Sequence, residues 1–316
     1  MNITITQLEY IVAVDTHRNF AKAAAHCFIT QPTLSMQIKK LEQQLGVLIF
    51  DRSKKPVKPT TVGENVIEQA RSSLRSLTKI EEIIMDSKGE IKGELRIGVI
   101  PTLAPYLLPR FIVSFVEKYP NTKLRLEELL SDQILNRLSM DLLDVGIMIP
   151  PTNSSIHSIH LFQEEFLLYS SSNHRLLSRK EIEIKDLNTQ DLWLLKDGHC
   201  FRDQVESICG QEISHNSTRS IQFESGSLET LKSFINKKQG FTLLPELATL
   251  DWRTDEKKRL RRFKGEKPVR EVGLVVHRSY LKEGLIKVLK EEIIASLPTE
   301  VLGKTSTRVI KWMPES

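Results

Sequence analysis

The apolar positions at the start of the chain follow the period of short helices. Residues 6–9, Thr-Gln-Leu-Glu, have the form of a helix capping box, and Leu8, Ile11 and Val12 then form one apolar side. The alanine-rich residues 19–28 predict a second helix that can pack closely against its neighbours. This pattern predicts an N-terminal block of short, closely packed helices.

A third helix is predicted between Thr30, which can cap it, and Gly46, which can end it. Its apolar stripe recurs at spacings of four, three and four residues and consists of Leu34, Ile38, Leu41 and Leu45. The opposite side is formed by Pro32, Met36 and Lys39, flanked by Thr33, Ser35 and Lys40. A small-polar and basic outer face suits a helix that enters the major groove of DNA.

Two longer patterns follow. Between residues 62 and 87 the apolar positions average about 3.6 residues apart, which predicts one long amphipathic helix; they are Val66, Ala70, Leu74, Leu77, Ile80 and Ile84. This helix either packs against its own domain or pairs with a second copy. From about residue 93 strand-like runs alternate with helical ones, which predicts α/β units around mostly parallel sheets.

Charge adds a functional hint to the N-terminal block. Of the net charge of +5, residues 1–60 carry +4, from eight Lys and Arg against four Asp and Glu. Within this block residues 50–63 read as a basic β-wing, whose Arg52, Lys54, Lys55 and Lys58 could neutralise phosphates. A three-helix bundle with a solvated basic side fits the periodicity equally well.

The composition limits where in the cell the protein is expected and which kinds of site it can contain. A chain of 316 residues can form two or three domains, and no apolar run approaches the roughly 20 residues that span a bilayer. The N-terminus lacks the pattern of a secretory signal, and three cysteines are too few for a disulfide scaffold. We therefore expect a cytoplasmic protein without a membrane segment, and no C-x2-C pair suggests a zinc site.

Two of the three cysteines lie in residues 196–210, KDGHCFRDQVESICG. Cys200 falls where a helix should begin, beside His199 and near Arg202, and each of these features favours the reactive thiolate. If residues 200–209 are helical, the Cα atoms of Cys200 and Cys209 are roughly 13 Å apart, beyond the roughly 7 Å that a disulfide allows. The two thiols are therefore either independent core cysteines, as we expect for Cys27, or a redox pair that bonds only when the helix unwinds.

Three hydroxyl residues also follow strand-like runs. Thr102, Ser131 and Ser227 either cap the helices that come next or together form the rim of a small polar site. The basic residues 252–270 contain several acidic residues and are interpreted as a solvated loop rather than a second nucleic-acid patch.

The stretch AKAAAHCFITQPTLSMQIKKLEQQLGVLIFDR, followed by TTVG, resembles the winged helix-turn-helix of LysR-type transcriptional regulators. The resemblance implies a DNA-reading helix and a wing on the DNA backbone, with contacts from Gln31, Pro32, Thr33, Ser35, Met36, Lys39, Arg52, Lys54 and Lys55. Met36 departs from the polar or basic residue often found at its position.

The same resemblance implies the domain organisation. A winged helix-turn-helix domain would cover residues 1–61, and a linker and dimerisation helix would cover residues 62–92. A two-lobed α/β effector domain, like the periplasmic binding proteins, would cover residues 93–316. Its lobe I would comprise residues 93–164 and 268–302, its lobe II residues 165–267, and its tail residues 303–316. The partners implied are double-stranded DNA, RNA polymerase and further copies of the chain, as a homodimer or homotetramer.

The segment LKDGHCFRDQVESIC resembles the sensing segment of the peroxide-responsive activators within this family, and so do residues 100–109 and 227–248. The resemblance implies that peroxide oxidises Cys200, that Cys209 resolves the product to a disulfide, and that a cellular dithiol reduces it again. The pocket residues implied are Thr102, Ser131, His199, Arg202 and Asp203. Ser131 replaces a usual threonine, and Phe201 is bulkier than the usual leucine.

This resemblance predicts an activator of transcription in oxidative stress that is not an enzyme and needs no cofactor or metal. Two alternatives share parts of the pattern. One is a LysR-type regulator that senses a small metabolite between the lobes, with incidental cysteines. The other, a thiol peroxidase, shares the Cys200 chemistry but does not explain the DNA-binding block.

Overall fold

The computed structural model describes residues 3–87, 91–152, 156–210, 225–237, 240–277, 282–303 and 308–314. The chain divides into two compact units, of which the first ends at residue 90 and the second comprises residues 91–278 and 282–316. Each unit has its own apolar core and is described separately below.

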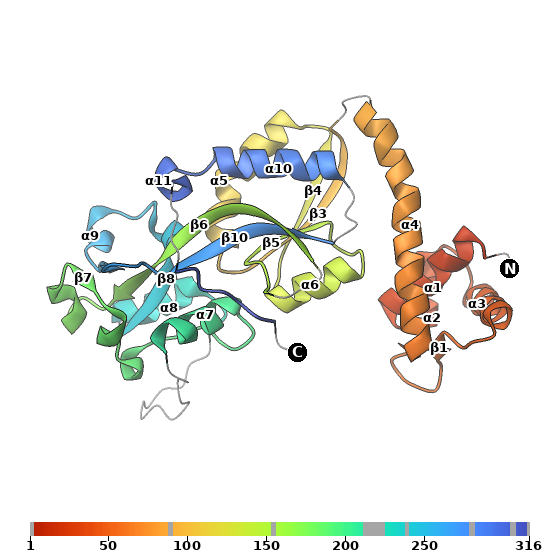
Figure 1. Ribbon diagram of the computed structural model, residues 1–316, viewed down its shortest axis with the longest axis horizontal. Coiled ribbons are helices and arrows are strands. Elements are labelled where there is room, and N and C mark those ends of the chain that lie inside the picture. The colour runs from red at the N-terminus through yellow and green to blue at the C-terminus, as the bar shows by residue number, and fades with distance from the viewer. Residues whose placement is uncertain are drawn as a thin grey trace. The chain divides into compact units, whose positions relative to one another are not determined.

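The first unit is a block of helices with a small wing (Figure 1). It comprises α1 (Ile5–His17), α2 (Phe20–His26), α3 (Gln31–Leu45), the antiparallel strands β1 (Phe50–Asp51) and β2 (Lys58–Pro59), and α4 (Thr61–Ser87). The predicted stripe of α3 faces the core, where Leu34, Ile38 and Leu41 are at most 1 % exposed. Thr30 caps α3 by accepting a hydrogen bond from the Thr33 amide, and Gly46 ends the helix with a φ of 70°. Periodicity and caps therefore located this helix correctly.

The predicted capping box of α1 was wrong by two residues. Thr4 is the N-cap: its hydroxyl accepts from the Gln7 amide at 3.3 Å, and the Gln7 side chain accepts from the Thr4 amide at 3.1 Å. Thr6 lies inside the first turn instead. Glutamine at the third helical position serves a capping box as well as glutamate does, so the sequence contains two overlapping candidates.

The helix α4 divides its apolar positions between two environments. Ile67 and Ala70, near its start, are buried in the core of the first unit, and the buried Arg71 donates to Asp15 of α1 at 2.9 Å. Farther along, the apolar side chains are 39–60 % exposed; they are Leu77, Ile80, Ile83 and Ile84. The first half of the helix therefore packs on its own unit, and the second half presents an uncovered apolar side.

The second unit is built on one eight-stranded sheet with the order β4-β3-β5-β10-β6-β9-β7, in which β8 also pairs with β6. The strands are β3 (Gly93–Val99), β4 (Thr122–Glu128), β5 (Val145–Met148), β6 (His157–Ser170), β7 (Glu181–Ile182), β8 (Phe241–Pro245), β9 (Leu260–Phe263) and β10 (Val269–Val276). The pairs β3–β4, β3–β5 and β7–β9 are parallel, whereas β10 and β6 run antiparallel to each other and to their other partners. The expected mostly parallel sheet is thus a mixed one.

The long strand β6 belongs to both halves of this sheet. Its residues up to Glu165 pair with β10, and from Phe166 onward they pair with β8. We call the half with β3, β4 and β5 lobe I and the half with β7, β8 and β9 lobe II. The strands β6 and β10 run antiparallel to all their partners, so the sheet contains fewer parallel pairs than the alternation of strand-like and helical runs predicted.

Helices cover both faces of lobe I, with α5 and α10 on one side and α6 on the other (Figure 1). The helices of the unit are α5 (Ala104–Lys118), α6 (Ser131–Ser139), α7 (Cys200–Cys209), α8 (Leu228–Lys237), α9 (Thr254–Lys257), α10 (Glu283–Ala295) and α11 (Thr299–Leu302). Short 3-10 turns lie at Arg175–Ser178, Ile184–Asp186, Thr189–Asp191 and Glu246–Thr249. In lobe II the core is formed by residues such as Phe166 and Phe201, whose rings stack with centroids 5.4 Å apart.

Two sequence interpretations in lobe II need correction. Residues 252–270 are not a solvated loop, since they form α9, β9 and the start of β10. Arg262 of this stretch pairs with the buried carboxylates of Glu165 and Glu246, which require a cation. Residues 191–197, one of the strand-like runs that alternate with helical runs after residue 93, contribute only isolated bridges at Leu192 and Leu195.

Candidate functional site

Cys200 is the first residue of α7, at the point where the chain turns out of residues 192–196. Gly198 makes this turn with a φ of 86°, a conformation that side chains rarely adopt. The Cys200 side chain is 3 % exposed and packs inside the unit. The turn at Gly198 therefore places the Cys200 thiol in the interior of the unit rather than at its surface.

Burial decides the acidity of this thiol. It raises the pKa of Cys200 to about 11, and the Ser131 hydroxyl and the charge of Arg270 only partly oppose it. The expectation that His199, Arg202 and the helix N-terminus would lower the pKa was therefore wrong for this form of the protein. Arg202 is occupied elsewhere: its guanidinium donates to Glu206 and to the Leu195 carbonyl, both at 2.9 Å.

The cation that does reach the site is Arg270 of β10, which the sequence interpretation did not single out. Its side chain is fully buried and donates to Glu164 at 2.8 Å and to the Thr102 hydroxyl at 2.9 Å. Its guanidinium carbon also lies 5.2 Å from the centre of the Phe201 ring. The available signal was an arginine within the apolar run of residues 269–276, because a buried arginine needs a buried partner.

Two polar side chains, one preceding Cys200 in the chain and one close to its thiol, are buried. Ser131, the first residue of α6, is 1 % exposed and His199 is 4 % exposed. Among the described residues, His199 Nε2 has no hydrogen-bond partner, and Ser131 Oγ has none apart from the Cys200 thiol. Burial, aided by the charge of Lys196, lowers the pKa of His199, so the imidazole is neutral at neutral pH. Unpaired buried groups cost about 1–3 kcal/mol each, and a small polar molecule would satisfy them.

The Ser131 hydroxyl and the charge of Arg270 both act on the Cys200 thiol, Thr102 is bonded to that arginine, and His199 directly precedes Cys200 in the chain. Asp203, expected in the same pocket, instead accepts a hydrogen bond from the indole of Trp312 at 3.1 Å. It lies close enough to raise the pKa of Cys200 slightly, after burial. Arg202 and Asp203 therefore hold α7 in place.

Cys209 is the last residue of the same helix. Both cysteines are free thiols, and burial, followed by the charge of Glu206, raises the pKa of Cys209 to about 11. The nine helical steps between the two residues place their Cα atoms roughly 13 Å apart, too far for a disulfide. Gly210, with a φ of 68°, ends the helix, and residues 211–224 lie outside the described part.

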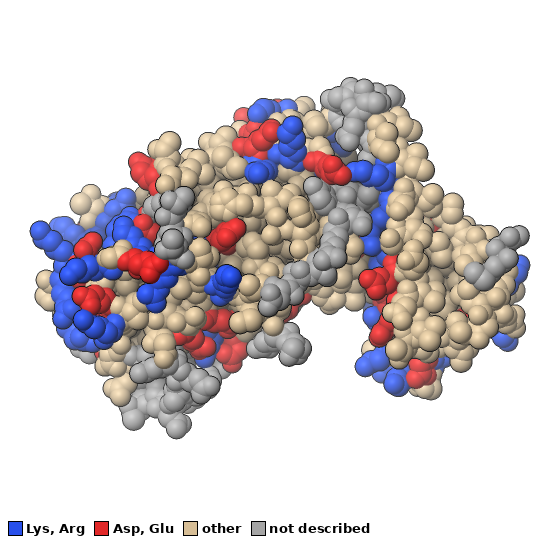
Figure 2. Space-filling model, viewed as in Figure 1, with Lys and Arg blue, Asp and Glu red and all other residues tan. Residues whose placement is uncertain are grey.

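A second candidate surface lies on the first unit. The side chains of Gln31, Pro32, Met36 and Lys39 are exposed on α3, and Thr33 and Ser35 are partly exposed. Lys54 and Lys55 are exposed on the wing, and Figure 2 shows basic side chains at that end of the unit. Arg52 is held by Ser35 at 3.1 Å and by Glu42 at 3.0 Å, so it ties the wing to α3 instead of extending freely.

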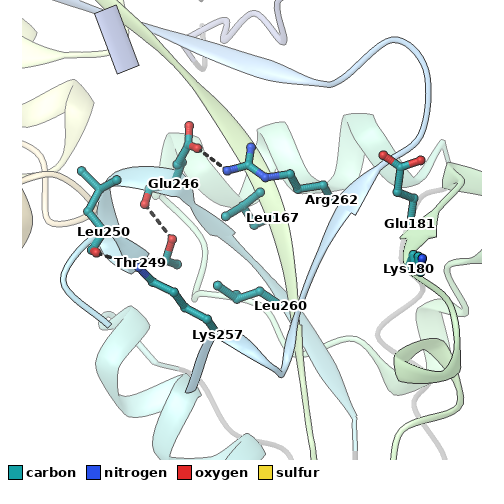
Figure 3. A pocket seen from close by; sticks show the side chains of 9 residues that line it. All are labelled: Leu167, Lys180, Glu181, Glu246, Thr249, Leu250, Lys257, Leu260 and Arg262. Carbon is teal, nitrogen blue, oxygen red and sulfur yellow. Dashed lines mark hydrogen bonds and ion pairs between the residues drawn. The ribbon is translucent and has the colours of Figure 1, made fainter. Parts of the chain in front are cut away.

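Two cavities of the second unit do not include the cysteines. One, of about 430 Å³, is lined by residues of lobe II such as Glu246, Lys257 and Arg262 (Figure 3). The other, of about 420 Å³, lies between α5 and α8, and its Tyr106 and Lys232 both bond to Glu229 at 2.8 Å. Most of the polar groups that line these two cavities bond to one another. Neither cavity therefore supports a metabolite-sensing site more strongly than the surroundings of Cys200 support a cysteine-based one.

Within the described residues, no three His, Cys, Asp or Glu side chains are grouped to hold a metal ion. The described helices also include none that combines the length and apolar character needed to cross a membrane. Lys and Arg gather over α9 and β7, but Asp and Glu lie among them (Figure 2). The distribution of charge there does not mark a second nucleic-acid surface.

Comparison with protein families matches both parts of the chain. Residues 5–64 match the family of bacterial regulatory helix-turn-helix proteins of the lysR type, and residues 88–297 match the LysR substrate binding domain. The hydrogen peroxide-inducible genes activator of Dickeya chrysanthemi is 37 % identical over 247 residues, which cover 78 % of this chain and 80 % of that protein. The DNA-binding transcriptional dual regulator OxyR of Escherichia coli K12 is 36 % identical over the same shares of the two chains.

Solved structures agree with these relatives. A full-length OxyR variant from Pseudomonas aeruginosa superposes with a TM-score of 0.76 at 32 % identity, covering 93 % of this chain and 98 % of the other. Reduced OxyR from Porphyromonas gingivalis gives a TM-score of 0.61 at 29 % identity, covering 69 % and 99 %. The predicted fold class, a winged helix-turn-helix with a long helix and a two-lobed α/β domain, is confirmed.

Proposed function

Because the chain belongs to the LysR family of DNA-binding transcriptional regulators, we propose that it senses hydrogen peroxide through Cys200 and Cys209. The observation that carries this proposal is the buried position of Cys200 at the start of α7. A buried thiol, close to the buried Ser131 hydroxyl and preceded by the buried His199, begins a helix that carries a second free thiol at its other end. The names of the relatives, which include peroxide-inducible activators, support the same assignment.

The surroundings of Cys200 suit peroxide by their polarity. Peroxide carries two donors and several acceptor lone pairs, which the hydroxyl groups of Thr102 and Ser131 and the neutral His199 would bind. The Cys200 thiol loses its proton, and the thiolate attacks one peroxide oxygen. The O–O bond breaks and the departing hydroxide takes up the proton to become water, leaving Cys200 as a sulfenic acid. The charge of Arg270 favours the thiolate, as its effect on the pKa indicates.

The second step uses Cys209. Its thiol attacks the Cys200 sulfenic acid, a disulfide forms, and the hydroxyl leaves with the thiol proton as a second water molecule. Because roughly 13 Å separates the two residues, α7 must unwind before this step. A cellular dithiol would return two electrons and two protons and restore the helix. The disulfide therefore reports peroxide as a change of backbone conformation.

The response would reach DNA through the first unit. We assign base contacts to the exposed residues of α3 and phosphate contacts to Lys54 and Lys55. Arg52 would contribute by fixing the wing to α3. The exposed apolar residues of α4, Leu77, Ile80 and Ile84, would pair with a second copy, so that two reading heads occupy two half-sites in a homodimer or homotetramer. RNA polymerase would be the partner for activation.

The decisive experiment maps the disulfide. Reduced protein is treated with stoichiometric peroxide, free thiols are blocked, and the protein is digested with trypsin without reductant. Cys200 and Cys209 fall on peptides 197–202 and 203–219, which we expect to find joined. Cys27→Ser is the matched control and should leave the joined peptide unchanged, whereas Cys200→Ser should remove both the joined peptide and the effect of peroxide on DNA binding. If Cys200 and Cys209 are both recovered as blocked thiols from peroxide-treated wild-type protein, the mechanism is excluded.

A further inference from the structure

The C-terminal segment, residues 308–314, returns to the sheet after α11. The Val269 amide donates to the Arg308 carbonyl at 3.1 Å, and the Ile310 amide donates to the Val269 carbonyl at 2.8 Å. The Thr152 amide and hydroxyl both donate to the Trp312 carbonyl, at 3.0 Å and 2.6 Å. Ile310 and Trp312 are buried, at 8 % and 4 % exposed. The segment is therefore a packed part of the second unit.

The same segment bonds to the first half of α7. The indole nitrogen of Trp312 donates to Asp203 at 3.1 Å, and the Gln204 side chain donates to the Ile310 carbonyl at 2.7 Å. Ile310 also belongs to the apolar core that contains Phe201. Figure 1 shows the segment, in dark blue, running beside α7. Two successive residues of the helix, three and four positions after Cys200, are thus held from outside the helix.

We propose that the C-terminal segment stabilises the helical, reduced form of α7 and so sets how readily peroxide switches the protein, with Trp312 as the main positioning residue. This rests on the proposed function, in which α7 unwinds to join Cys200 and Cys209. Unwinding must break both hydrogen bonds. Gln204 is fully buried and its Oε1 atom has no partner among the described residues, so the lost bond would leave its whole amide group unpaired.

The test compares Trp312→Phe with wild type. Phenylalanine retains a ring in the core but lacks the N–H that binds Asp203. We expect the equilibrium between dithiol and disulfide, measured in thiol–disulfide buffers by blocking free thiols and weighing the protein, to shift toward the disulfide by roughly tenfold. Disulfide formation after peroxide should also be faster. Trp252→Phe, which removes an indole elsewhere in lobe II, is the matched control and should match wild type.

The outcomes separate the two proposals. If wild type forms no disulfide between Cys200 and Cys209, the proposed function fails. If wild type forms it and Trp312→Phe has the same equilibrium within about twofold, only the role of the C-terminal segment fails.

A second measurement needs no substitution at Trp312. Hydrogen exchange of the Ile310 and Thr152 amides should be slow in reduced wild type and in Cys200→Ser treated with peroxide, and faster in oxidised wild type. Equal exchange in all three samples would overturn the proposal.

Discussion

The helices α3 and α7 look alike in outline but are stabilised in different ways. Both bury one apolar side, and both end at a glycine in the left-handed conformation, Gly46 and Gly210. The first turn of α3 is capped by the Thr30 side chain, whereas His199 before α7 makes no side-chain cap. Two polar residues of α7 instead bond to distant parts of the chain: Asp203 to Trp312, and Gln204 to Ile310 across 106 positions.

The difference indicates what each helix can do. A helix that contains its own cap and stripe keeps its shape when neighbouring parts move, which suits a surface that must fit DNA. A helix held by outside contacts can be released when those contacts change, which suits a switch. The three predictions below test this contrast, from the largest expected effect to the smallest.

Breaking the outside support of α7 at Arg270 should be the most damaging change. Arg270→Met keeps the volume of the side chain but leaves Glu164 as an unpaired buried charge. We expect the free energy of unfolding, measured by urea denaturation, to fall by about 3–5 kcal/mol. The double variant with Glu164→Gln should recover part of this loss. A single variant as stable as wild type would show that α7 does not depend on the pair.

Alkaline pH should weaken the second unit through Cys200. The pKa of this thiol is about 11 in the folded chain against an ordinary value of 9.0, so folding binds its proton more tightly. Its stabilising contribution is therefore complete below about pH 9 and is lost as the pH rises toward 11, by about 1–3 kcal/mol. Urea unfolding of the reduced protein at pH 8 and pH 10 measures the loss. Cys200→Ser should show a smaller loss; an equal loss would assign the pH dependence to other groups.

Removing the cap of α3 should have the smallest effect. Thr30→Ala deletes the acceptor of the Thr33 amide and should lower the free energy of unfolding of the first unit by about 1 kcal/mol. Thr78→Ala, on the exposed side of α4, serves as the control. No loss at Thr30 beyond that of the control would mean that tertiary packing, rather than its own cap, determines the start of α3.

The sequence was informative where structure is local and less so where it is not. Period and caps located α3, and period located α4; residues 200–209 form the helix that the sequence analysis took as the condition for keeping Cys200 and Cys209 apart. The partners of Arg270 and Asp203 lie more than 100 positions away, so no local pattern could identify them. Arg202 led to the opposite error. It is close to Cys200 in the sequence and was expected to act on the thiol, but in the structure it bonds to Glu206 and to the Leu195 carbonyl. The acidity of the thiol was misjudged for the same reason, since burial is a property of the whole unit.

The position of β10 has a consequence for how the protein folds during synthesis. This strand lies between β5 and β6 in the sheet, yet it is the last of the strands in chain order. While residues 269–276 are still inside the ribosome, the nascent sheet carries two open edges at its centre. Open edges invite pairing with other chains, so this period should be when the growing chain depends most on chaperones.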